Sequence, residues 1–326
     1  MSYPLRLAIP MTVFLISVTS SALETDQYMA WGEHLNDSSH ALESYLEKQT
    51  NSVLQRVNQG RNWKSRDCWS IALEISKTEK STLSFIDHIE DWAFDRGEVD
   101  TFPSYKFERN STTETSVYRE AFFRRFLPLG KTMEVYDVRF GTDKLSHFIT
   151  VGGEYLKRYL ETLRTGGTKN QAILAGVNYG IYTENNFFGY TSSGVFSYAD
   201  LESNFQGMNY LRSFCEGKDP LLQQTLRGWE LSRRINLEPY INPYWDESFY
   251  PSHMLANLFS KVKPYLMTHC PNLDTWWIRR QKNRYTEKVQ ELPEHLGMKQ
   301  VNLLITQGIL IDPSRTQSLE AICPKQ

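Results

Sequence analysis

Apolar residues recur every three to four positions along most of the chain, which is the spacing of amphipathic α-helices. The clearest stripe lies between Ser38 and Asn58 and consists of Leu42, Tyr45, Leu46, Val53, Leu54 and Val57. The same spacing predicts further helices over 68–75, 85–92, 117–126, 141–163, 170–182, 197–214, 221–235, 254–266, 273–284 and 301–310. We therefore predict a mostly α fold, a single helical globular domain.

Residues that favour helix starts support several of these boundaries. Thr142, Thr168 and Ser197 each precede a helical stretch and are expected N-caps, with Asp200 completing a capping box after Ser197. Between the helices, the loose alternation of 133–140 predicts a short strand. The glycines and aromatic residues of 185–196 predict a turn or a small β-hairpin.

The first 22 residues have the pattern of a signal peptide. A short segment with one positive charge, Met1–Arg6, precedes an apolar run from Leu7 to Val18, and Ser20-Ser21-Ala22 offers small residues for cleavage. The apolar run is shorter than the roughly 20 residues that span a bilayer. We expect cleavage near Ala22, a periplasmic or secreted protein, and no stable membrane insertion.

The four cysteines, Cys68, Cys215, Cys270 and Cys323, form an even set in a chain expected to be exported, which favours two disulfides. Three pairings are possible, and we favour Cys68–Cys215 with Cys270–Cys323. No Cys-x-x-Cys pair and no zinc-like Cys/His spacing occurs.

Charge and motifs narrow the possible functions. A net charge of −2 and a pI near 6.4 give no basic bias, so nucleic acid is not an expected partner. P-loop, dinucleotide-binding, zincin, α/β-hydrolase and EF-hand patterns are all missing, and we expect no cofactor. Aromatic residues make up 13% of the chain; most must lie in the core, and others are compatible with stacking on sugars.

The segment from Glu184 to Leu211 carries a resemblance. An apolar helix ends at Glu184, the Gly-rich stretch Phe188-Gly189-Tyr190-Thr191-Ser192-Ser193-Gly194-Val195-Phe196-Ser197 follows, and a capped helix then begins. Gly194-Val195-Phe196-Ser197 is similar to the Gly-Leu-Met-Gln turn of the lysozyme and lytic transglycosylase superfamily. Asp200–Leu211 resembles the Asn-Ile-x-x-Gly-x-x-Tyr-Leu helix of that family.

The resemblance implies a lysozyme-like core over 131–216, between an N-terminal helical region (23–130) and a C-terminal one (217–326) packed on that core. It also implies that Glu184 is a general acid that cleaves the glycan strands of peptidoglycan or another polysaccharide. Such an acid must stay protonated near neutral pH, and burial beside aromatic rings raises a carboxyl pKa. Asp200 and Glu202 are the candidate second carboxylates, with Ser197 beside them. The alternatives are a helix cap for Asp200 and a solvated helix end for Glu184.

A second group of candidates lies in Asp143-Lys144-Leu145-Ser146-His147-Phe148. Asp143 and His147 share a helix face at i and i+4, and Glu154 follows two turns later. The Asp-Lys-x-x-His-Phe string resembles uncharacterised exported bacterial proteins. The pattern fits a metal site, an acid–base dyad, support for Glu184, or a core histidine paired with the carboxylate at the helix start. We expect no bound metal.

A third group is the Pro- and aromatic-rich loop 240–250. Tyr244 and Trp245, together with Tyr190, are candidates for stacking on a sugar. A connector whose rings pack on the domain is the other interpretation.

The leading functional prediction is an exported lysozyme-like glycosidase. The alternatives are a non-catalytic periplasmic binding or structural protein, and a metal-dependent hydrolase using Asp143 and His147.

Overall fold

A computed structural model describes residues 24–79, 87–95, 97–103, 116–118, 129–292 and 297–324. The expected signal peptide, most of the expected helix over 117–126, and Phe85 and Ile86 at the start of the third helix lie outside the described residues.

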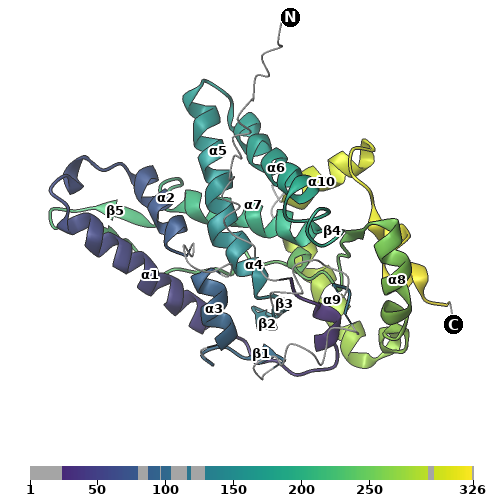
Figure 1. Ribbon diagram of the computed structural model, residues 1–326. Helices are drawn as coiled ribbons and strands as arrows, with labels where there is room; N and C mark the ends of the chain where they lie inside the picture. The colour runs from purple at the N-terminus through teal and green to yellow at the C-terminus, as the bar shows by residue number, and fades with distance from the viewer. Residues whose placement is uncertain are drawn as a thin grey trace, which may run out of the picture.

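Helices dominate the described chain, as the apolar spacing predicted (Figure 1). Thr168 and Ser197 are N-caps whose side chains accept backbone N–H groups, as expected. The α-helices are α1 (Ser39–Gln59), α2 (Cys68–Thr78), α3 (His88–Asp95), α4 (Asp143–Ser146), α5 (Gly152–Arg164), α6 (Lys169–Asn186), α7 (Tyr198–Ser213), α8 (Ala256–Met267), α9 (Trp276–Glu291), α10 (Gly297–Thr306) and α11 (Leu319–Ile322). Short 3-10 helices are η1 (Gln27–Ala30), η2 (Trp63–Ser65), η5 (Pro243–Trp245), η6 (Cys270–Asp274) and η7 (Pro313–Arg315).

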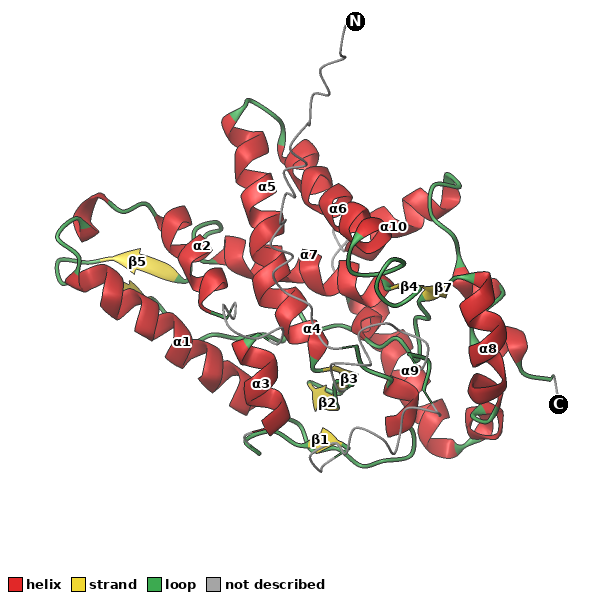
Figure 2. Cartoon of the chain, viewed as in Figure 1, coloured by secondary structure: helices red, strands yellow, loops and turns green. Residues whose placement is uncertain are grey.

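The strands are short, antiparallel and lie in three separate small sheets (Figure 2). The first sheet has the order β1-β2-β3, and the other two are the pairs β4-β7 and β5-β6. Their bounds are β1 (Thr101–Phe102), β2 (Thr132–Val135), β3 (Val138–Gly141), β4 (Val195–Phe196), β5 (Leu222–Gln224), β6 (Trp229–Leu231) and β7 (His253–Met254).

The single strand predicted over 133–140 is wrong, because the chain reverses inside it. Tyr136 and Asp137 both have positive φ angles, 51° and 60°, and join β2 to β3 as a tight hairpin. Positive φ at both central positions is the geometry of a two-residue turn that matches the twist of its strands. The Gly-rich stretch 185–196 does turn, but its strand β4 pairs with β7 from a distant part of the sequence.

The helix predicted over 221–235 is also wrong. Here β5 and β6 form a hairpin that turns at Gly228, with a φ of 143°, and Leu226 at the turn is 99% exposed. The hairpin is fastened to α1, because the side chain of Asn58 accepts from the N–H of Trp229 and donates to its carbonyl. These contacts with a helix distant in the sequence stabilise a hairpin where the local sequence pattern predicted a helix.

A π-helix interrupts the helix predicted over 141–163. Residues His147–Val151 (η4) adopt the wider π winding between α4 and α5. Such segments are rare and frequently occur at functional sites. The segment contacts α7, and α5 packs against both α6 and α7. The π-helix therefore lies where the central helices α5, α6 and α7 meet.

Glycines bring α7 unusually close to this π-helix. A Cβ on Gly207 would lie 1.7 Å from the carbonyl oxygen of Phe148, and one on Gly152 would lie 2.8 Å from Gly207. Neither position has room for a side chain. The two backbones therefore meet directly, and the polar side chains on either side of the contact are held within hydrogen-bond reach of each other.

The expected disulfides are present. Cys68 at the start of α2 bonds to Cys215 after α7, and Cys270 in η6 bonds to Cys323 after α11. The main cluster of buried apolar residues draws members from 42 to 285, and so includes residues of all three expected regions, beside two smaller clusters. Of the described helices, none is both long and apolar enough to cross a membrane.

Gly207→Ala should destabilise the protein by about 1–3 kcal/mol, because the added methyl group overlaps the carbonyl of Phe148. In an unconstrained helix the same change is stabilising by about 1 kcal/mol, so the sign is diagnostic. Denaturant unfolding measures it. Gly176→Ala, whose methyl group would approach Tyr155 at 3.2 Å, is the control and should lose much less. Equal stabilities for Gly207→Ala and wild type would contradict the close contact.

Candidate functional site

A fully buried lysine lies at the centre of the most highly charged cluster in the described structure. The ammonium group of Lys144 is 2.5 Å from Asp143, 2.7 Å from Asp200 and 2.9 Å from Glu247. These three carboxylates come from α4, from α7 and from the loop after η5. We call the group formed by Lys144, its three carboxylates, His147, Glu184 and Glu24 the Lys144 cluster.

Hydroxyl groups donate hydrogen bonds to two of the three carboxylates. Thr25 donates to Asp143 over 2.6 Å, and Ser197 and Tyr118 donate to the two oxygens of Glu247 over 2.5 and 2.8 Å. Burial lowers the pKa of Lys144, but the adjacent carboxylates outweigh it and hold that pKa well above its usual value. The three carboxylates therefore favour the charged form of Lys144 inside the protein.

His147, the first residue of the π-helix, contacts α7 through both ring nitrogens. Its Nε2 is 3.2 Å from Asp200, and its Nδ1 is 3.1 Å from the side-chain oxygen of Asn204. Since that amide oxygen only accepts, Nδ1 carries a hydrogen and Nε2 faces the carboxylate. The expected i, i+4 pairing of His147 with Asp143 is not formed, because Asp143 turns to Lys144 and Thr25.

Glu184, near the C-terminal end of α6, also belongs to the Lys144 cluster. Its side chain is 1% exposed, one oxygen accepts from the backbone N–H of Ser197, and the other is buried without a hydrogen-bond partner among the described residues. Burial, and secondarily the charge of Asp200, raises the pKa of Glu184 well above its usual value. Glu184 is not the solvated helix end that was the alternative.

A glycine contact and a backbone hydrogen bond hold Glu184. A Cβ on Gly189 would lie 2.7 Å from its carboxylate, and the Gly-rich turn therefore packs directly on this side chain. The N–H of Ser197 is the one that Asp200 was expected to accept in a capping box, and Glu184 accepts it instead. Asp200 is left to contact Lys144 and His147, while the hydroxyl of Ser197 still accepts from the N–H of Asp200.

Glu24 is an acidic residue of the cluster that the sequence patterns did not single out. Burial, followed by the charges of Asp200 and Glu247, raises its pKa well above the usual value. Its carbonyl accepts from the N–H of Gly130 over 2.7 Å, which fixes the start of the described chain against β2. The cluster thus contains two carboxyl groups, of Glu24 and Glu184, that favour the protonated form.

Glu202, the other candidate for the second carboxylate, makes its hydrogen bonds outside the Lys144 cluster. It accepts from Gln206 over 2.7 Å, from Asn242 over 2.8 Å and from the N–H of Met298 over 2.8 Å. These bonds join α7 to the segment before η5 and to the start of α10. We therefore correct its assignment to a structural one.

The remaining candidates lie outside the cluster. Trp245 is fully buried between Phe140 and Phe148, so it belongs to the core and cannot stack on a ligand. Tyr244 contacts Tyr250 with its ring tilted by 57° and lines a small cavity of about 220 Å³. Tyr190 bonds to His253. Glu154, half-buried in α5, makes none of the contacts of the cluster.

Within the described part of the chain, no three His, Cys, Asp or Glu side chains are arranged to hold a metal ion. Asp143 pairs with Lys144 and Thr25, and His147 contacts Asp200 and Asn204.

Sequence reasoning missed Glu24, Lys144 and Glu247 as site residues. Lys144 had a signal, since it stands between the candidates Asp143 and His147. Glu247 lay in the aromatic loop as one of several polar residues, and Glu24 follows the expected cleavage site by two positions. The structure brings Asp143 and His147 together with Glu184, Ser197 and Asp200, which follow them in the chain by 37 to 57 residues.

Comparison with known proteins adds nothing to these contacts: the chain matches no protein-family model, no curated protein and no solved structure.

The raised pKa of Glu184 predicts a change in the pH dependence of stability. The native state holds this proton more tightly than the unfolded state, so the associated stability is present below pH about 4.5 and is lost as pH rises through the native pKa. Glu184→Gln, which needs no proton, should match the wild type near pH 4 and exceed it by about 1–3 kcal/mol near pH 7.

Urea unfolding at both pH values measures this difference. Glu161→Gln, a half-exposed carboxylate on α5, is the control and should show no pH-dependent gain. A Glu184→Gln protein that is less stable than the wild type at both pH values would contradict a protonated Glu184.

Proposed function

We propose that this chain is an exported glycoside hydrolase of lysozyme or muramidase type, which cleaves the glycan strands of peptidoglycan with Glu184 as the general acid. The observation that carries the proposal is the state of Glu184. It is a buried carboxyl group with a raised pKa, at the C-terminal end of a helix, beside a Gly-rich turn.

The two oxygens of Glu184 have different surroundings, which suits proton donation. The backbone N–H of Ser197 holds one oxygen as an acceptor, whereas the other has no hydrogen-bond partner among the described residues. A proton on the second oxygen would be available for a leaving group, because no protein acceptor competes for it. Its donation would return Glu184 to the ionised form near Lys144.

A glycosidase also needs a group that stabilises the positive charge of the transition state or activates water. Asp200 is our candidate. It is near enough to Glu184 to raise the pKa of that carboxyl group, and Lys144 and His147 fix its position. Two carboxyl groups in different surroundings, one favouring the acid form and one paired with the buried Lys144, can take the two roles.

The expected export of the chain supports the choice of polymer. The N-terminal 22 residues have the signal-peptide pattern, and the two disulfides are typical of oxidising compartments outside the cytoplasm. Peptidoglycan is the glycan that an exported bacterial protein meets there.

A non-catalytic binding protein is the second candidate. The observation that favours it is the burial of the cluster, since Glu184 is only 1% exposed and lines neither the small cavity beside Tyr244 nor the cleft described below. In that case the charged cluster serves to hold the central helices together, and a glycan binds without being cut.

Digestion of purified sacculi, with the products identified by mass spectrometry, separates the two candidates. The wild type should release glycan fragments, and Glu184→Gln should reduce the rate by about 10²–10⁴-fold because general acid catalysis is lost. Activity should decline as pH rises through the raised pKa of Glu184, since only the protonated form donates.

Glu161→Gln is the matched control and should keep full activity. Undiminished cleavage by a folded Glu184→Gln protein would rule out the assignment. No cleavage by the wild type on acetylated or de-N-acetylated sacculi would favour the binding protein.

A further inference from the structure

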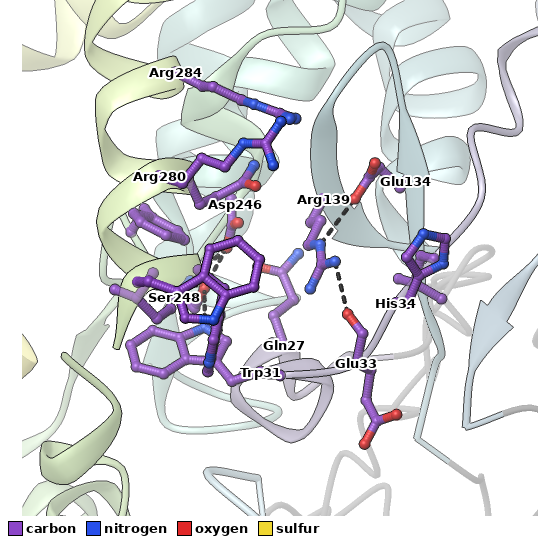
Figure 3. Close-up of a pocket in the computed structure, with 17 residues that line it drawn as sticks. Gln27, Trp31, Glu33, His34, Glu134, Arg139, Asp246, Ser248, Arg280 and Arg284 are labelled. Atoms are coloured by element: carbon purple, nitrogen blue, oxygen red, sulfur yellow. Dashed lines mark hydrogen bonds and ion pairs between the residues drawn. The ribbon is translucent and has the colours of Figure 1, made fainter. Parts of the chain in front are cut away.

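A cleft of about 460 Å³ lies apart from the Lys144 cluster, between α9, η1 and the β2–β3 hairpin (Figure 3). This volume is within the range of roughly 300–1,000 Å³ that is usual for small-molecule sites. The cleft has one aromatic and one charged side. None of Lys144, His147, Glu184 and Asp200 lines it, so it requires an explanation of its own.

Tryptophan rings form the aromatic side. Trp31 is fixed by a bond from its Nε1 to Ser248 and by edge contact with Trp277 at 6.1 Å between centroids. Trp277 in turn lies over Gly32, whose φ of 90° brings the chain beneath the ring. Trp276 is different, because it is 72% exposed. An exposed tryptophan at the rim of an aromatic cleft offers a flat apolar face to a ligand.

The charged side contains three arginines, of which two are already neutralised. Arg139 donates to Glu134 over 2.9 Å and to the carbonyls of Ala30 and Glu33. Arg284 forms an ion pair with Asp137 at 2.7 Å. Among the described residues, no carboxylate lies within ion-pair distance of Arg280, which projects from α9 toward Arg139 (Figure 3).

The acidic residues of the cleft do not supply the missing partner. Asp246 is buried and accepts from Tyr285 and Ser248, and burial raises its pKa to about 6. The carboxylate of Glu33 points away from the arginines (Figure 3). One guanidinium, Arg280, is thus left without a counter-charge beside an open aromatic face.

We propose that this cleft binds an anionic saccharide. A sugar ring would stack on Trp276, and the carboxylate of a sugar acid would pair with the guanidinium of Arg280, whose planar fork matches a carboxylate. The partly buried ring of Trp31 and the polar groups around it form the floor against which a second sugar ring rests. The concave shape favours a discrete ligand over a membrane surface, for which a convex apolar face is typical.

The inference stands apart from glycan cleavage at Glu184, and its test is a binding measurement. Isothermal titration compares trigalacturonate with α-1,4-galactotriose, two trisaccharides that differ in bearing carboxylates or hydroxymethyl groups. The acidic trisaccharide should bind at least about tenfold more tightly, and added salt should weaken it, because the distinguishing contact is ionic.

Substitutions assign the binding to this cleft. Arg280→Gln should weaken trigalacturonate binding by about 10–100-fold, to the level of the neutral trisaccharide. Trp276→Ala should weaken the binding of both trisaccharides. Arg279→Gln is the matched control: this neighbour on α9 is paired with Asp274, does not line the cleft, and should leave binding unchanged.

Three outcomes would overturn the inference: no binding of either trisaccharide, equal binding of the two, or equal losses in Arg280→Gln and Arg279→Gln. Phosphatidylglycerol vesicles are the third probe. Vesicle binding that depends on Trp276 and Arg280, without trisaccharide binding, would identify the region as a membrane-contact surface instead. The Glu184→Gln protein should bind trigalacturonate like the wild type, which keeps this result independent of the hydrolase proposal.

Discussion

A buried lysine is the constraint on which the centre of this protein depends. Removing an ammonium group from water is costly unless carboxylates compensate for the lost hydration, and loss of one partner from a buried ion pair typically costs about 3–5 kcal/mol. Lys144 obtains its partners from α4, α7 and the loop after η5. Satisfying this one charge therefore fixes how three distant parts of the chain meet.

The backbone around the lysine is shaped to allow these contacts. The π-helix begins at His147, and Gly152 and Gly207 let it lie directly against α7. Burial within this cluster, followed by the charges of neighbouring carboxylates, raises the pKa values of Glu24 and Glu184 well above the usual value, so these two groups favour the protonated form. A folded protein that keeps such groups buried gives up stability near neutral pH, which is typical of sites retained for chemistry.

Local sequence patterns predicted much of the fold and part of the site. The favoured cysteine pairing, one of three possible, is the one that formed. The stripe of α1, the caps Thr168 and Ser197 and the presence of two disulfides followed from spacing and residue type. The hairpin of β5 and β6 did not, because its stability comes from Asn58 of α1. For the same reason Glu202 and Trp245 looked like site residues: their types suit a glycan site, but only tertiary contacts reveal that one joins helices and the other fills the core. Glu24 and Glu247 are each more than 100 positions from Lys144 in the sequence, and no local pattern predicts contacts over such a separation.

The central claim, that the folded protein keeps a protonated carboxyl group at Glu184, is open to direct measurement by infrared difference spectroscopy at neutral pH. The spectrum of Glu184→Gln subtracted from that of the wild type isolates this one side chain from Glu24. We expect the carbonyl band of a carboxylic acid in the difference spectrum, disappearing as pH rises through the raised pKa. A difference spectrum that contains only the bands of an ionised carboxylate at neutral pH would contradict the account.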